Sequence, residues 1–162
     1  MCVSGSEVGW GLNLSTMQRL TDKTLFKGQL VYGKGIQNHL TDAGPDIGIK
    51  NNLSDLTTPV LGVSLPVVGG LVFLEHSWNA KWSSTVGYSK IRIYNSDAQA
   101  GHAFKTGNYA TVNLLYHPFP GSYIGTELIY GDRNNFHDGF SSSALKLQFS
   151  VKYDIFHAFV GD

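Results

Sequence analysis

The chain has 162 residues, twelve basic and twelve acidic side chains, zero formal net charge and 42% hydrophobic residues. This length suits one domain covering residues 1–162. The basic residues are scattered along a neutral chain, so the composition argues against nucleic acid as a partner. Cys2 is the single cysteine, which excludes an intramolecular disulfide and a cysteine-rich metal site.

Apolar and polar residues alternate with a period of two near the start of the chain, which predicts β-strands with one apolar face. The first strand is predicted at about 7–16 and the second at 24–33. The short polar segment between them is typical of a hairpin turn. A long connection, 34–69, follows the second strand.

The middle of the chain contains three further predicted strands. The third and fourth, 70–79 and 82–94, are joined by a tight turn. The alternation in the fourth strand slips near Lys90, which predicts a β-bulge there. The fifth strand, 108–117, is followed by two prolines and a glycine that end it.

The last two predicted strands are 122–131 and 143–155. In the seventh strand, apolar residues such as Leu145 and Leu147 alternate with polar ones such as Lys146. The predicted connections are short after the first, third and fifth strands and long after the others. This rhythm predicts an antiparallel sheet built from hairpins.

The length of the predicted strands separates two β architectures. A tilted strand that spans a bilayer needs roughly 9–11 residues, whereas soluble strands are usually about half as long. Lys146 and Lys152 on one face of one strand suit a water-filled lumen better than a protein core. The sequence therefore predicts an all-β, antiparallel transmembrane β-barrel in the bacterial outer membrane, with its apolar face in contact with lipids.

Aromatic residues near the predicted strand ends support this interpretation, because aromatic girdles mark both interfaces of membrane barrels. They are Trp10, Tyr32, Trp78, Trp82, Tyr116, Tyr130 and Tyr153.

Two alternatives to a transporting membrane barrel stay open. A one-sided antiparallel sheet in a soluble β-sandwich or ligand-binding barrel also alternates, and a non-transporting structural or binding barrel would show the same pattern.

Several segments resemble the DcaP-like porins of Gram-negative outer membranes. They include Asn79-Ala-Lys-Trp-Ser-Ser-Thr-Val-Gly-Tyr-Ser89, Ala103-Phe-Lys-Thr-Gly-Asn-Tyr-Ala110 and Gly125-Thr-Glu-Leu-Ile-Tyr-Gly-Asp-Arg133. The resemblance implies a sixteen-stranded, trimeric barrel through which small, often anionic, hydrophilic solutes diffuse passively. About seven strands cannot form that barrel, so the resemblance implies that the chain corresponds to its carboxy-terminal part. Family members usually end at the aromatic residue that closes the last strand, whereas residues 156–162 continue here.

The predicted inner face gives the candidate functional residues. Charged side chains that line a lumen set its field and selectivity, and the alternative is ordinary solvation of a wet wall. The pore-lining candidates are Lys27, Glu75, Glu127, Lys146 and Lys152, and the cationic candidates on the loop side are Arg92 and Arg133. The long connection, 34–69, either folds inward and narrows the passage or caps the barrel at its surface.

No grouping of a nucleophile and a base predicts catalysis, so we expect no enzymatic activity and no catalytic residues. The histidines are dispersed and lack the close spacing of metal ligands. We therefore expect neither a metal site nor a cofactor.

Overall fold

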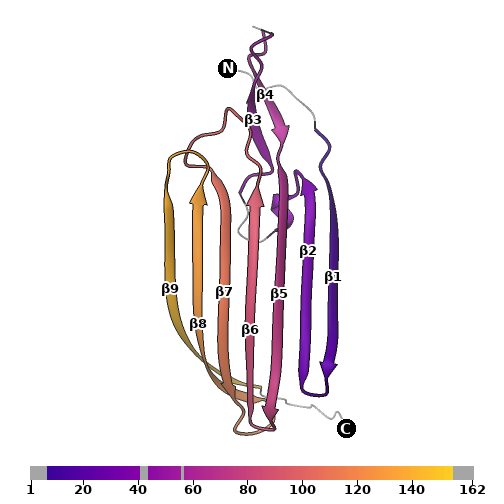
Figure 1. Ribbon diagram of the computed structural model, residues 1–162, viewed down its shortest axis with the longest axis vertical. Helices are drawn as coiled ribbons and strands as arrows, with labels where there is room; N and C mark the ends of the chain where they lie inside the picture. The colour runs from indigo at the N-terminus through magenta and orange to yellow at the C-terminus, as the bar shows by residue number, and fades with distance from the viewer. Residues whose placement is uncertain (1–6, 41–43, 56, 155–162) are drawn as a thin grey trace, which may run out of the picture.

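Seven long β-strands form one antiparallel sheet (Figure 1). The computed structural model describes residues 7–40, 44–55 and 57–154. The strand order is β1-β2-β5-β6-β7-β8-β9, so strands that follow one another in the chain are paired, apart from the β3–β4 hairpin between β2 and β5. This is the all-β, antiparallel strand arrangement that the alternation predicted.

The seven strands contain 11 to 14 residues each, about twice the usual soluble length and enough to cross a bilayer at a tilt. Short turns follow β1, β5 and β7 at one end of the sheet, the turn end, and longer connections follow β2, β6 and β8 at the other, the loop end (Figure 1). The strands are β1 (Trp10–Thr21), β2 (Thr24–Lys34), β5 (Pro66–Asn79), β6 (Trp82–Ile93), β7 (Phe104–Tyr116), β8 (Ser122–Asn135) and β9 (Ser141–Tyr153).

The predicted strand boundaries differ from the observed ones mainly in polar and glycine-containing segments. β1 continues to Thr21 where the prediction ended at 16, and β8 continues to Asn135 where it ended at 131. β5 begins at Pro66 and β7 at Phe104, each four residues before the predicted start. These residues look like loop residues in sequence, but ladder hydrogen bonds to neighbouring strands hold them in the sheet. Residue 155, the predicted end of the last strand, lies outside the described residues.

The two faces of the sheet differ in composition. On one, which we call the outer face, the strand register aligns apolar residues in rows across the sheet. One such row is Phe26, Leu74, Val86, Val112, Leu128 and Leu147. Large apolar side chains on this face are exposed in the isolated chain, with Phe149 at 75%. The opposite, inner face carries most of the polar side chains in the middle of the strands.

β6 has no bulge near Lys90, contrary to the prediction. Lys90 pairs in register with Gly70 on β5 and Asn108 on β7. The alternation slips in sequence because the outer face of β6 changes from apolar to basic: Tyr88 is followed by Lys90 and Arg92 on the same face. Only the chemical character of the side chains changes, and the strand pairing of β6 stays regular.

The connection between β2 and β5 divides into two parts with different positions. Its first part turns at Gly35, with φ +67°, into the short 3₁₀ helix η1 (Gln37–His39). Beyond it, the β3–β4 hairpin (Ile47–Asn51 and Val60–Ser64) extends past the loop end of the sheet (Figure 1). The 34–69 segment, predicted as one long loop, thus contains three regular elements.

The first part of this connection packs on the inner face of the sheet. Leu65, Val67 and Ile93 form a cluster that is at least 98% buried, and Ile36 and Leu40 pack against it. The backbone is tied at the same place, because Gly35 N–H donates to the Leu65 carbonyl at 2.9 Å and the buried Gln37 side chain donates to that carbonyl at 3.1 Å. The turn around η1 therefore lies on the inner face, as the inward-folding alternative requires, while the hairpin projects away.

Candidate functional site

The five predicted pore-lining residues all lie on the inner face, distributed over four strands. Lys27 on β2 and Glu75 on β5 form an ion pair through Nζ and Oε1, and both side chains are about 40% exposed. Because the two charges compensate each other, this part of the inner face is close to neutral.

Glu127 on β8 belongs to a hydrogen-bonded row across the middle of the inner face. The Thr111 hydroxyl donates to its Oε1 at 2.6 Å. In the same row, the Thr85 backbone N–H donates to the side-chain oxygen of Asn113 at 2.9 Å. Glu127 pairs across the ladder with the uncharged Gln148, and the Thr111 hydroxyl that donates to it is also neutral. These contacts hold the side-chain oxygens of Glu127 and Asn113 in fixed positions on the inner face.

The two lysines of β9 differ in their surroundings. Lys152 lies 3.0 Å from the Asp154 carboxylate. Lys146 lies opposite Ile129 and has no ion-pair partner within 4.0 Å among the described residues. Lys146 is therefore the pore-lining candidate whose positive charge is least compensated.

The two loop-side arginines lie on opposite faces. Arg133 on β8 is on the inner face, where its guanidinium lies 5.6 Å from the Phe104 ring and donates to the His102 carbonyl at 3.3 Å. Arg92 on β6 is on the outer face, with its guanidinium 4.9 Å from the ring of Tyr94. Of the two, only Arg133 could therefore meet a solute on the inner face.

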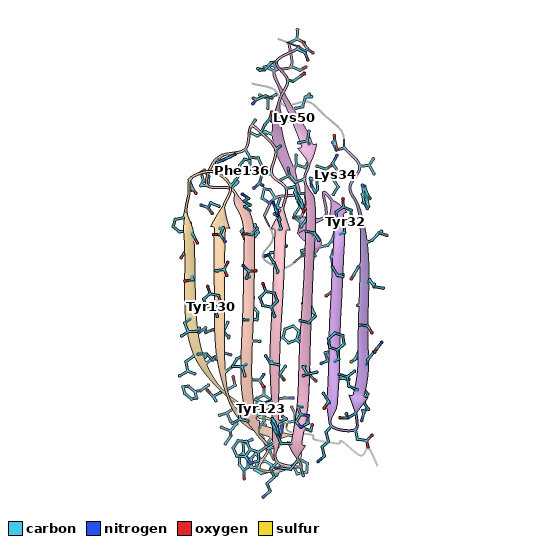
Figure 2. All side chains as sticks on the ribbon, in the orientation of Figure 1. Tyr32, Lys34, Lys50, Tyr123, Tyr130 and Phe136 are labelled. Atoms are coloured by element: carbon cyan, nitrogen blue, oxygen red, sulfur yellow. The ribbon has the colours of Figure 1, made fainter. Side chains whose placement is uncertain are left out.

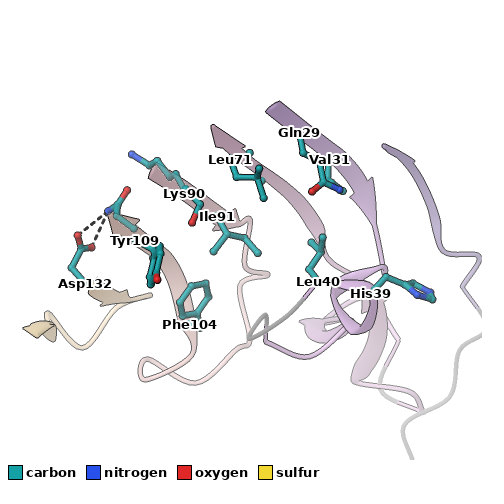
Figure 3. Close-up of a pocket in the computed structure, with 15 residues that line it drawn as sticks. Gln29, Val31, His39, Leu40, Leu71, Lys90, Ile91, Phe104, Tyr109 and Asp132 are labelled. Carbon is teal, nitrogen blue, oxygen red and sulfur yellow. Dashed lines mark hydrogen bonds between the residues drawn. The ribbon is translucent and has the colours of Figure 1, made fainter. Parts of the chain in front are cut away.

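A hollow of about 490 Å³ lies on the inner face below the turn around η1. Leu71, Ile91 and Phe104 extend from three strands toward Leu40, and Tyr109 and Gln29 continue the lining (Figure 3). Charge identifies the candidate residues in the sequence, and it does not distinguish these uncharged residues of the inner face. Leu71, Ile91 and Tyr109 have the parity opposite to the apolar outer-face residues of their strands, whereas Phe104 reaches the inner face through the register shift between Phe104 and Thr106.

Acidic side chains at the loop end are held ionised by hydrogen bonds. The hydroxyls of Thr57 and Thr58 donate to the Asp55 carboxylate and, together with the Thr57 N–H, lower the pKa of Asp55 to about 2. The Asn135 amide and the Phe140 N–H likewise lower the pKa of Asp138. At neutral pH, these connections therefore present negative charge beyond the sheet.

The apolar band on the outer face runs obliquely across the strands. In the row of Lys90, the outer-face residues are apolar on β1 and β2 and polar on β6, β7 and β8: Leu14, Leu30, Gly70, Lys90, Asn108 and Asp132. Two rows toward the turns, the outer-face residues are polar only at Gln18 on β1 and apolar from Phe26 on β2 to Leu147 on β9. The band is thus displaced toward the loop end on β1 and toward the turn end on β9.

The size of this displacement matches the tilt of membrane barrels. Tyr32 on β2 and Tyr130 on β8 mark the loop-side limit of the band, and Tyr32 lies nearer the loop end (Figure 2). Tyr32 aligns with Asn134, four residues beyond Tyr130, a shift of about 13 Å along the strands. The four strand spacings between them amount to about 19 Å. The band is therefore inclined by about 35°, within the 35–45° at which strands tilt in membrane barrels.

The long antiparallel strands and the oblique apolar band have the geometry of a segment of a transmembrane β-barrel. The crystal structure of the outer membrane channel DcaP of Acinetobacter baumannii is similar to this chain, with a TM-score of 0.68 and 18% sequence identity. The similarity covers 90% of this chain and 40% of that channel, so the chain spans well under half of the channel's length. At this identity, the likeness concerns the fold.

No protein-family model and no curated protein matches the chain. Among the described residues, no group of three or more His, Cys, Asp or Glu side chains could hold a metal ion. In the same part of the chain, no helix is long and apolar enough to cross a membrane.

Proposed function

We propose that the chain forms part of the wall of a DcaP-like, porin-type channel in the bacterial outer membrane. Its outer face contacts lipid and its inner face lines a water-filled passage for the passive diffusion of small hydrophilic solutes. The observation that carries the proposal is the oblique apolar band, because its exposed apolar residues form a belt inclined to the hydrogen-bonded rows by the angle at which strands tilt in membrane barrels. A homotrimer of the complete barrel belongs to the same proposal.

The charges on the inner face support a weak preference for anions. The Lys27–Glu75 and Lys152–Asp154 pairs are internally compensated. Among the candidate residues, this leaves Arg133 and Lys146 against Glu127. An excess of one positive charge favours anions without excluding cations, since wall charges tune permeation and do not form a discrete site.

Single-cysteine variants test which face meets water. In a Cys2→Ser background, we expect Gln148→Cys to react with a charged, membrane-impermeant thiol reagent and to lower the single-channel current in planar bilayers. Phe149→Cys, one residue further on the outer face, is the matched control and should not react. Reaction at Phe149→Cys with protection of Gln148→Cys would invert the faces and refute the channel. Reaction of Gln148→Cys without discrete current steps would favour a barrel that does not transport.

Charge reversal at Lys146 tests selectivity separately. Lys146→Glu replaces the least compensated cation of the inner-face candidates, so we expect the reversal potential in a salt gradient to shift toward cation selectivity. Lys27→Gln breaks an ion pair and leaves Glu75 uncompensated, so a smaller shift in the same direction is expected. Lys90→Glu on the outer face controls for a change of net charge alone. An equal shift from Lys90→Glu and Lys146→Glu would contradict the assignment of Lys146 to the passage.

A further inference from the structure

The outer face contains a groove over β1, β2, β5 and β6, toward the loop end of the apolar band. Its volume is about 570 Å³, within the range of ligand-binding pockets. The groove exists because Gly28 on β2 and Gly70 on β5 place no side chain between larger neighbours. Its walls are formed mainly by Leu14, Leu30, Val72 and Tyr88.

Lys90 lies at one end of this groove. It pairs across the ladder with Gly70, so no side chain separates its ammonium from the groove floor. Arg92 follows on the same face of β6, about 7 Å further along the strand. Neither cation has a carboxylate within 4.0 Å among the described residues. The groove therefore leads to two basic side chains that have no ion-pair partner in the described part of the chain.

The neighbouring acidic residue does not compensate Lys90 directly. Asp132 lies two strands away in the same row, where the Asn108 amide donates to both of its oxygens at 2.8 and 3.1 Å. Asn108 also accepts a hydrogen bond of 2.7 Å from the Tyr88 hydroxyl. This chain of hydrogen bonds fixes the Tyr88 hydroxyl toward β7, at the edge of the groove, and engages the Asp132 carboxylate beyond Asn108.

We propose that this groove is a lipid site, in which one acyl chain of an anionic phospholipid lies along Leu30 and Val72 and its phosphate lies against Lys90 and Arg92. The inference rests on the proposed function, because only an outer face in the membrane meets lipid. The position supports it, since Tyr88 is an aromatic residue at the loop-side limit of the apolar band, at the depth where headgroups begin. The positive charges of Lys90 and Arg92 complement the negative charge of the phosphate, and the apolar walls of the groove complement the acyl chain.

Native mass spectrometry of the detergent-solubilised protein tests the site. With dioleoylphosphatidylglycerol and dioleoylphosphatidylcholine offered together, we expect the protein to retain the anionic lipid preferentially. The Lys90→Gln variant should retain about fivefold less phosphatidylglycerol, the loss expected when one cation no longer contacts an anionic lipid. Its retention of phosphatidylcholine should not change. Lys146→Gln removes the same charge from the inner face and is expected to leave both lipids unaffected.

A second variant tests the groove. Gly70→Val places a side chain over its floor and should lower the retention of both lipids, with the sheet content verified by circular dichroism. Equal retention of the two lipids by the unmodified protein would overturn the headgroup site while leaving a lipid-facing wall intact. A change of oligomeric state in Lys90→Gln, with lipid retention unchanged, would assign the groove to a second copy of the chain and also overturn the proposal. A monodisperse protein without detergent would instead refute the proposed function itself.

Discussion

Replacing Phe149 by arginine is expected to destabilise the protein in lipid bilayers by about 2–4 kcal/mol. Phe149 is the middle one of five apolar residues on the outer face of β9, from Leu145 to Tyr153, and its side chain is 75% exposed in the isolated chain. A guanidinium at this depth loses its hydration or forces the bilayer to thin locally. The measurement is equilibrium unfolding by guanidinium chloride in phosphatidylcholine vesicles, followed by tryptophan fluorescence.

Ser150→Arg is the matched control for Phe149→Arg. It introduces the same side chain one residue later in β9, on the inner face opposite Gly125. The new charge would then lie in the aqueous passage, so we expect a change of less than about 1 kcal/mol. If the two variants lost equal stability, the two faces of β9 would have similar surroundings. The membrane orientation of the sheet would then be wrong.

Alternation alone predicted the fold because side chains on neighbouring residues of a strand point to opposite faces. In β9, this pattern was unbroken and gave both the strand and its faces. The alternation is weaker in segments where the residues on both faces are polar or small. The first residues of β5 and β7 and the last residues of β8 were therefore assigned to connections, although ladder hydrogen bonds hold them in strands.

The candidate site was predicted less completely than the fold. Alternation placed Lys27 and Glu75 on one face, but their ion pair depends on the register between β2 and β5, which the sequence pattern does not contain. The sequence pattern places Arg92 and Arg133 together on the loop side, but they lie on opposite faces because β6 continues without a bulge at Lys90 and Arg92 keeps the face of Tyr88. The oblique band also depends on the registers between the strands, which the sequence pattern does not contain. The alternation in a single strand distinguishes its two faces, but it does not give the tilt of the strand.

The turn around η1 is the feature of the inner face whose loss should change transport most. Its attachment depends on the cluster of Leu65, Val67 and Ile93, in which Ile93 is 2% exposed. Ile93→Asn removes buried apolar contacts and places an amide among aliphatic side chains. We expect a local cost of about 3 kcal/mol. Because the cluster joins the turn to the wall, this cost should detach the turn while the ladders of β6 remain.

Detachment should have two measurable results. The single-channel conductance of Ile93→Asn should exceed that of the unmodified protein, because Leu40 and the turn no longer narrow the inner face. Protease should cleave between β2 and β5 at concentrations that leave the unmodified protein intact. Ile129→Asn, the same substitution on the inner face of β8 but outside the cluster, is expected to change neither result. A cleaved connection with unchanged conductance would mean that the turn packs on the wall without restricting the passage. Steric narrowing would then have to come from another part of the complete barrel.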